Sequence, residues 1–168
     1  MKILVTGSAG FIGFHLCNLL CKNKKISLIG IDNLNNYYDV SLKKNRLKIL
    51  KNNHKNFNFF KLDIENQSKI KDLFRLHKFK IVIHLAAQAG VRYSIAEPRK
   101  YLNANIIGFF NLIEQAKNAK VKHFLFASTS SVYGNSKNFP LDENENTDKP
   151  LSFYAATKKS NEVMAYSF

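Results

Sequence analysis

The sequence is short of cysteine, of arginine and of long hydrophobic runs. Its two cysteines, Cys17 and Cys21, fall within one expected helix, where they are better interpreted as small core residues than as part of a disulfide framework. No apolar stretch approaches the roughly 20 residues of a membrane-spanning helix, and no secretory leader is recognisable. These absences favour a cytoplasmic protein without a membrane partner.

The net charge is strongly of one sign, since 26 Lys and Arg against 12 Asp and Glu leave +14. Only four of the cations are arginine, and the lysines are spread along a chain that is also rich in asparagine. A nucleic-acid site is expected to cluster arginine with aromatic residues, so we expect no nucleic-acid partner. The five histidines lack metal-ligand spacing, and we expect no metal site. His84 in particular, on an expected core strand, is interpreted as a satisfied buried histidine.

Strand patterns alternate with helical patterns along the chain. Strands are expected at 2–6, 26–31, 57–61, 80–85 and 122–127, and helices at 11–22, 40–52, 66–76, 98–119 and from 152 onward. The first helix carries an apolar side made of Phe11, Ile12, His15, Leu16, Leu19 and Leu20. Strands separated by helices imply crossover connections and a parallel sheet. The sequence therefore predicts an α/β fold, a Rossmann-type doubly wound parallel sheet with helices on both faces, over residues 1–168.

Three glycines follow the first expected strand and open the first helix. Gly7 allows a tight turn, Gly10 lets the backbone approach a pyrophosphate, and Gly13 lets helix and strand pack closely. Phe14 follows where a kinase-type phosphate loop would need lysine. Asp32 ends the second strand, about twenty residues further on, where a carboxylate accepts from a ribose 2′-hydroxyl and repels a 2′-phosphate. The pattern predicts NAD rather than NADP.

Tyr154 and Lys158 lie one helical turn apart in the last expected helix. An ammonium beside a phenol favours the phenolate and lowers its pKa toward neutral pH. Such a pair can act as a general acid/base. The spacing also occurs by chance, with the tyrosine packed and the lysine solvated, so the pair gains its weight from the glycine turn.

From Thr6 to Gly13, TGSAGFIG resembles the fingerprint of the extended short-chain dehydrogenases of the NAD-dependent epimerase/dehydratase family. The resemblance continues over essentially the whole chain, in the family's order, through IDNLNNYYDVSLKKNRL, LDI, HLAAQAGVRYS, NANIIG, ASTSSVYG and YAATK. The first and third of these segments look most like UDP-glucuronate 4-epimerases. Chains of that family are considerably longer, so the resemblance implies a fold truncated before a C-terminal substrate domain, with the NAD-binding domain itself incomplete.

The resemblance also implies functional residues. Tyr154 and Lys158 become the catalytic pair, and Thr129 positions the reacting sugar hydroxyl. The implied cofactor-binding residues are Gly7, Gly10, Phe11, Ile12, Gly13, Asp32, Asn33, Asp63, Ile64, Leu85, Ala86, Ala87, Gln88, Asn105, Tyr154 and Lys158. Ser130 and Ser131 stand where the sister 4,6-dehydratases carry Asp-Glu. They could donate to a sugar carboxylate or simply shape a turn. Arg92 could face acidic groups of the substrate or be a solvated loop charge.

The activity implied by the resemblance is NAD-dependent 4-epimerisation of a UDP-sugar, with UDP-glucuronate converted to UDP-galacturonate through a transient 4-keto sugar. A nucleotide-sugar 4,6-dehydratase and a stand-alone NAD-binding module without turnover remain alternatives. Residues 1–168 alone are expected to show little or no turnover, because the family's UDP-gripping part lies further along the chain. The parent enzyme is expected to be a homodimer.

Overall fold

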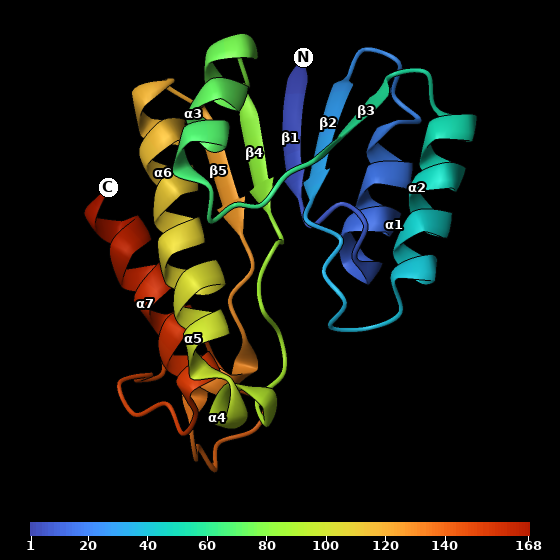
Figure 1. Ribbon diagram of the computed structural model, residues 1–168. Helices are drawn as coiled ribbons and strands as arrows, with labels where there is room; N and C mark the ends of the chain where they lie inside the picture. Colours follow the sequence, from blue (N-terminus) through green and yellow to red (C-terminus); the bar gives the residue numbers. More distant parts are fainter.

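The computed structural model describes every residue from 1 to 168, and its centre is a five-stranded parallel sheet (Figure 1). The strands are β1 (Lys2–Thr6), β2 (Ser27–Asp32), β3 (Phe57–Lys61), β4 (Ile81–His84) and β5 (His123–Phe126). Their order is β3-β2-β1-β4-β5, and every neighbouring pair is parallel. The order reverses between β1 and β4, which is the switch point of a doubly wound nucleotide-binding sheet. The predicted fold class is confirmed.

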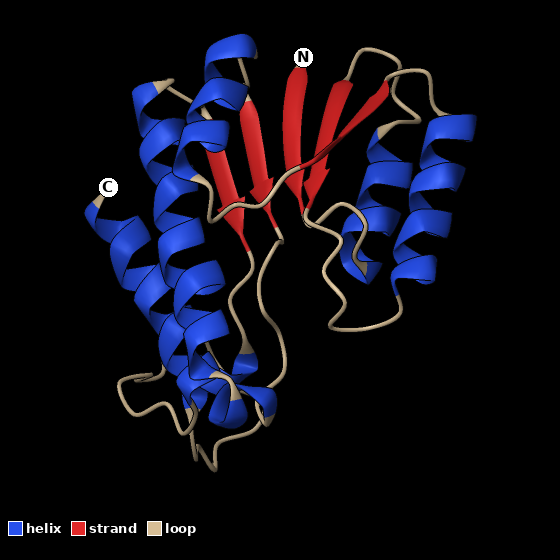
Figure 2. Ribbon diagram, in the orientation of Figure 1, coloured by secondary structure: helices blue, strands red, loops and turns tan.

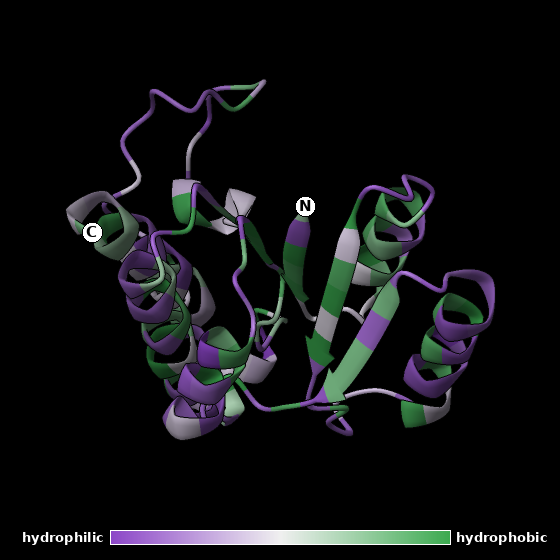
Figure 3. Cartoon of the chain, turned by 90° about the horizontal axis from the view of Figure 1, so that it is seen from above, coloured by the Kyte–Doolittle hydropathy of each residue, from purple (hydrophilic) through white to green (hydrophobic).

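Helices cover both faces of the sheet (Figure 2). One face carries α1 (Phe11–Leu20) and α2 (Val40–Asn53), and the other carries α3 (Gln67–Leu76) and α6 (Gly108–Asn118), with α7 (Phe153–Ser167) beside α6. The strands are mostly hydrophobic, and the helices carry many hydrophilic residues, except α1, which is largely hydrophobic (Figure 3). None of the helices has the length and hydrophobicity needed to cross a bilayer.

The buried apolar side chains form two clusters, one on each face of the sheet. Residues of α3 and α6 pack with Leu4 and Ile31 on one face. Residues of α1 and α2 pack with Ile3 and Val5 on the other. Successive residues of a strand point to opposite faces, so β1 supplies both clusters. This explains why β1 and β2 are continuous apolar runs without polar alternation.

The apolar side expected of α1 packs on the sheet only in part: Leu16 and Leu20 are partly buried against the hydrophobic cluster, but the other members of that side are exposed. Gly13 and Cys17 are the buried residues of this helix, whereas Phe11, Ile12 and Leu19 are each more than 60% exposed. A Cβ at Gly13 would stand 2.1 Å from the carbonyl oxygen of Gly7. The helix therefore presents its small residues to the sheet, because only they allow so close an approach. Cys17 is confirmed as a core residue and carries no disulfide.

The expected helix at 98–119 has three consecutive parts. It begins as α5 (Pro98–Tyr101), with Pro98 in its first turn, passes through a π-helical segment η1 (Leu102–Ile107) and continues as α6. Two further short helices were not anticipated: α4 (Tyr93–Ala96) and the 3₁₀ turn η2 (Ser130–Tyr133). Elements of four residues offer too short a window for a periodic pattern. The segment between β5 and α7 extends away from the carboxyl ends of the strands (Figure 1).

Candidate functional site

A pocket of about 580 Å³ lies where the carboxyl ends of β1, β2, β3 and β4 meet. Ligands of doubly wound sheets bind at this place, and the volume is in the range of small-molecule and cofactor sites. The pocket brings together predicted residues from four separate segments. Those that line it are Gly7, Gly10, Phe11, Asp32, Asn33, Asp63, Ile64, Leu85, Ala86, Ala87 and Gln88.

The glycine turn forms the middle of the pocket and has no room for side chains. Gly7 has φ +70°, and a Cβ there would meet the backbone N of Ala86 at 2.8 Å. Gly10 is the N-cap of α1 and no side chain caps the helix. The first N–H groups of α1 thus keep no side-chain partner, at the positive end of the helix dipole. A helix N-terminus of this kind suits a pyrophosphate.

Asp32 stands at the end of β2 with its carboxylate held by two backbone N–H groups. Leu34 N donates to Oδ1 at 2.9 Å, and Ala9 N donates to Oδ2 at 3.2 Å. Each carboxylate oxygen can accept more than one hydrogen bond, so the group is oriented but still able to accept from a ribose. Beside it, Asn33 Nδ2 donates to Asp63 Oδ2 at 2.9 Å. The ends of β2 and β3 are thereby joined at the predicted adenosine end.

Three cations that line the same pocket were missed from the sequence: Lys43, Arg46 and Lys100. Lys43 is buried, and its Nζ donates to the backbone O and to Oδ1 of Asn35, both at 2.8 Å. Burial lowers the pKa of Lys43, while the charge of Asp32 acts in the opposite direction. In a chain with lysines throughout, no sequence signal singled these three out. They add positive charge where an anionic ligand is predicted.

Tyr154 and Lys158 lie on α7, outside the lining of this pocket. Tyr154 is half-buried, and its ring meets that of Tyr101 edge-on with centroids 6.1 Å apart. Lys158 is only 3% exposed. Burial lowers the pKa of Lys158 to about 8, against the opposing effect of Glu162. The interpretation of Lys158 as a solvated surface charge is therefore wrong.

A buried histidine connects this lysine with the glycine turn. Thr6 Oγ1 accepts from the backbone N–H groups of Leu85 and Ala86 at 3.2 and 3.1 Å, and lies 2.7 Å from His84 Nδ1. Its two lone pairs are thus engaged, so the hydroxyl donates to Nδ1 and the imidazole is neutral. Burial lowers the pKa of His84 to about 3, and the charge of Lys158 adds to this effect. The prediction of a satisfied buried histidine is confirmed.

Asn105 links the pocket to α7 from the π-helical segment. Its Oδ1 accepts from Gln88 N at 2.8 Å, and its Nδ2 donates to Gln88 O at 3.1 Å and to Thr157 Oγ1 at 3.0 Å. Asn161 Nδ2 on α7 donates to the Asn105 carbonyl at 2.6 Å. A π-segment frees carbonyls from the α-helical ladder and is often found at functional sites. Asn161, like Thr157, carried no signal in the sequence.

The remaining predicted residues are not all brought into the pocket. Ile12 is exposed, and Gly13 is buried behind the turn. Thr129 and Ser130 line a second, open hollow of about 450 Å³. Ser131 N donates to Thr129 Oγ1 at 3.2 Å, which caps η2 and agrees with a turn role for this segment. Arg92 is exposed before α4 and lines neither hollow.

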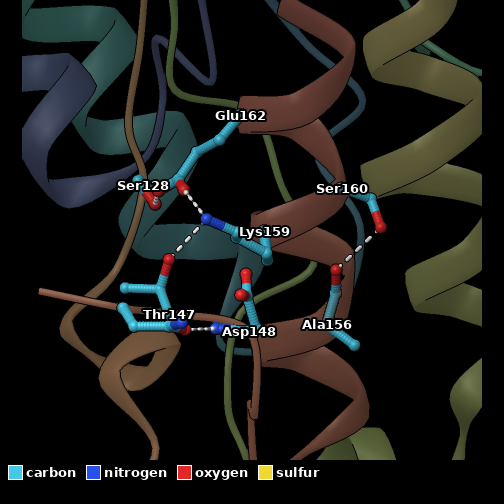
Figure 4. A network of polar contacts seen from close by, with 8 residues as sticks. Ser128, Thr147, Asp148, Ala156, Lys159, Ser160 and Glu162 are labelled. Atoms are coloured by element: carbon cyan, nitrogen blue, oxygen red, sulfur yellow. Dashed lines mark hydrogen bonds and ion pairs between the residues drawn. The ribbon is translucent and has the colours of Figure 1, made fainter.

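A polar network fastens α7 near this second hollow (Figure 4). Ser128 Oγ donates to Glu162, and Glu162 also forms an ion pair with Lys159 at 3.5 Å. Lys159 in turn donates to Thr147 in the segment that precedes α7. The helix is thus held between Ser128, two residues after the end of β5, and the loop before its own start.

A sequence model described as GDP-mannose 4,6 dehydratase matches residues 4–168. The chain belongs to the NAD-dependent epimerase/dehydratase family. Among its curated relatives is the UDP-glucuronate 4-epimerase of Thermodesulfobacterium geofontis, which is 46% identical over 98% of this chain and 50% of its own.

Solved structures of the family superpose closely on this fold. The UDP-glucuronic acid 4-epimerase of Bacillus cereus, in complex with UDP-glucuronic acid and NAD, is 38% identical with a TM-score of 0.90, over 99% of this chain and 52% of its own. The UDP-glucose 4-epimerase of Thermotoga maritima, with UDP-glucose, is also 38% identical, with a TM-score of 0.85 over 99% and 50%. The chain spans about half the length of the curated relatives it matches.

Proposed function

We propose that residues 1–168 are the NAD-binding and catalytic part of a nucleotide-sugar 4-epimerase. The observation that carries the proposal is that the loop containing Gln88 connects the pocket with α7. Gln88 lines the pocket, and its backbone is held on both sides by Asn105, which also bonds α7 through Thr157. A dinucleotide in the pocket would therefore contact the Gln88 segment, which Asn105 connects to α7, the helix that carries Tyr154.

The pocket residues fit NAD in shape and charge. Gly7 and Gly10 leave the turn open to a pyrophosphate, and Asp32 offers a carboxylate to the adenosine ribose. Bound NAD would supply a reversible hydride acceptor for C4 of the sugar. Asp32 favours NAD over NADP, because its charge repels a 2′-phosphate.

Tyr154 would remove the proton of the sugar C4 hydroxyl, and would return it after the bound 4-keto sugar has rotated to present its other face. Lys158 would stabilise the phenolate of Tyr154 through its charge and bind the nicotinamide ribose. The buried position of Lys158 strengthens that charge interaction, since water screens it little. Thr129 would bind the same sugar hydroxyl. These roles follow the family motif at matching positions.

UDP-glucuronate is the substrate that we infer. The relative from Bacillus cereus has a complex with UDP-glucuronic acid, but the equally identical relative from Thermotoga maritima has one with UDP-glucose. Ser130 and Ser131 favour the uronate, because hydroxyl groups can donate to a carboxylate. A 4,6-dehydratase would need an acid to protonate the leaving hydroxyl, and these two positions provide none.

Calorimetry of residues 1–168 tests cofactor binding. We expect NAD to bind at least tenfold more tightly than NADP, and equal or tighter binding of NADP would contradict the role of Asp32. Incubation of the full-length protein with NAD and UDP-glucuronate, followed by NMR of the products, tests the reaction. We expect UDP-galacturonate, lost in Tyr154→Phe. A 4-keto-6-deoxy sugar would instead identify a dehydratase, and a Tyr154→Phe variant with near-normal rate would contradict the catalytic assignment.

A further inference from the structure

Four tyrosines from four segments form a row beside the pocket. Ring centroids lie 5.2 Å apart for Tyr37 and Tyr93, 6.3 Å for Tyr93 and Tyr101, and 6.1 Å for Tyr101 and Tyr154. Tyr37 belongs to the loop between β2 and α2, and the other three belong to α4, α5 and α7. Tyr37, Tyr93 and Tyr101 are not among the residues of the predicted site.

The contact between Tyr37 and Tyr93 joins the two walls of the pocket. Tyr37 lines the pocket on the wall that follows β2, and Ala86 to Ala89 line it on the wall that follows β4. Tyr37 reaches across to the second wall, since its Oη would be 2.4 Å from a Cβ at Gly90. Gly90 tolerates this approach because it has no Cβ, and its φ of +98° also favours glycine. Tyr37 is 44% exposed, which places the contact at the outer rim of the pocket.

Each end of this contact is anchored independently to its own wall. The loop of Tyr37 is held by Lys43, which donates to Asn35. Tyr93 is held by Lys100, whose Nζ lies 2.5 Å from its hydroxyl.

The loop beneath Tyr93 is held by Tyr101, which donates to the carbonyls of Ala89 and Gly90 at 2.7 and 2.5 Å. Burial raises the pKa of Tyr101 to about 12, so its hydroxyl remains a donor at neutral pH. The ring contact between Tyr37 and Tyr93 is the only aromatic contact between the two walls. An aromatic pair of this kind changes an equilibrium by only about two- to tenfold, so it can open without disturbing either wall.

We propose that Tyr37 and Tyr93 form a strap that closes over the middle of the bound dinucleotide, so that release of the cofactor requires this contact to open. The inference rests on the proposed NAD site. It deepens that proposal, because a cofactor that is restored in every turnover has no need to leave. Residues outside the glycine fingerprint would thus retain the cofactor.

The test measures the rate at which NADH leaves residues 1–168 when excess NAD displaces it, followed by NADH fluorescence in a stopped-flow instrument. The chain contains no tryptophan to interfere. We expect Tyr37→Ala to raise the dissociation rate about tenfold and Tyr93→Ala to raise it similarly, with the double variant no faster than either. Tyr37→Phe keeps the ring and should release NADH at the wild-type rate. Tyr166→Ala, at a 98% exposed position on α7, is the matched control.

Tyr93 decides between a strap and a direct contact, because it does not line the pocket. A faster release in Tyr37→Ala with an unchanged rate in Tyr93→Ala would overturn the strap and leave Tyr37 as a simple pocket residue. Unchanged rates in both would overturn any role for the pair. A wild-type chain that binds neither NAD nor NADH would overturn the proposed function itself, and the strap with it. Melting curves of each variant confirm that the fold is kept.

Discussion

Two parts of the molecule are stabilised by different interactions: the strands and helices that form the pocket, and the helix α7 that carries Tyr154 and Lys158. In β1 and β2, nearly every side chain is buried, and both hydrophobic clusters draw on these strands. In β5, no side chain is fully buried, and Leu125 is 42% exposed. The last helix, α7, contributes no residue to either hydrophobic cluster.

Hydrogen bonds take the place of apolar packing around α7. Asn161 and Thr157 bond to Asn105 in the π-segment, and Lys159 and Glu162 bond to the segments on the other side (Figure 4). Hydrophobic burial is strong but tolerant of direction, whereas hydrogen bonds are modest in net energy and demanding in geometry. The difference implies that the pocket rests on a well-packed hydrophobic base, whereas the placement of α7, with the proposed catalytic pair, depends on a few polar contacts.

The largest expected effect is on the free energy of unfolding, and it compares a residue of β1 with a residue of α7. Leu4→Ala removes a fully buried side chain of β1 and should lower the free energy of unfolding by about 3–5 kcal/mol. Val163→Ala on α7, where the side chain is 60% exposed, should change it by less than about 0.5 kcal/mol. Urea denaturation measures both, and Ile29→Val, with about 0.5–1.5 kcal/mol, gives a milder core change. Equal costs at Leu4 and Val163 would contradict the comparison.

The same division explains what the sequence could predict. The pocket and its hydrophobic base follow from local rules, because apolar strands, glycines at fixed spacing and Asp32 at a strand end each act through their own segment. The packed side of α1 did not follow, since the close approach at Gly13 overrides the more hydrophobic stripe that contains Phe11 and Leu19.

The sequence was less informative around α7 and at Lys43 in the pocket. Asn161 and Lys43 look like any other residues of a chain rich in asparagine and lysine, and only the folded structure shows that they are buried. The π-segment that contains Asn105 has no periodic signature distinct from an α-helix over six residues. Contacts between segments far apart in the sequence hold Asn105 and Asn161, and Lys43 bonds a loop residue, Asn35, whose conformation has no periodic pattern.

The second expected effect is a change on the order of 3 kcal/mol in the free energy of unfolding, caused by the buried charge of Lys158 on α7. Burial lowers the pKa of Lys158 from 10.5 to about 8. Between these values the unfolded chain binds a proton that the folded chain does not, so the contribution of Lys158 to the free energy of unfolding should rise as the pH rises from about 8 to about 10.5. Burial raises the pKa values of Cys17 and Cys21, so these thiols act in the opposite direction above about pH 9, and the difference between the wild type and the Lys158 variant is the quantity to measure. Lys158→Met should remove most of this rise and stabilise the protein at pH 7. Part of the rise will remain, because burial lowers the pKa of Lys43 in the same direction.

Denaturant titrations at intervals from pH 7 to pH 10 provide the measurement for Lys158. Lys149→Met, at an exposed position before α7, is the control and should keep the wild-type slope. A Lys158→Met variant that keeps the full rise would mean that Lys158 is solvated in solution, and the polar half of the comparison would lose its buried charge.

The smallest expected effect tests the hydrogen bonds themselves. Asn161→Ala removes the donor to the Asn105 carbonyl at a fully buried position, and should cost about 1–3 kcal/mol, because the carbonyl is left without its partner. Lys159→Met breaks a half-exposed ion pair with Glu162 and should cost less than about 1 kcal/mol. The order of these two costs, measured by urea denaturation, is the decisive result. If Lys159→Met proves the more damaging, the outer network positions α7 and the π-segment does not.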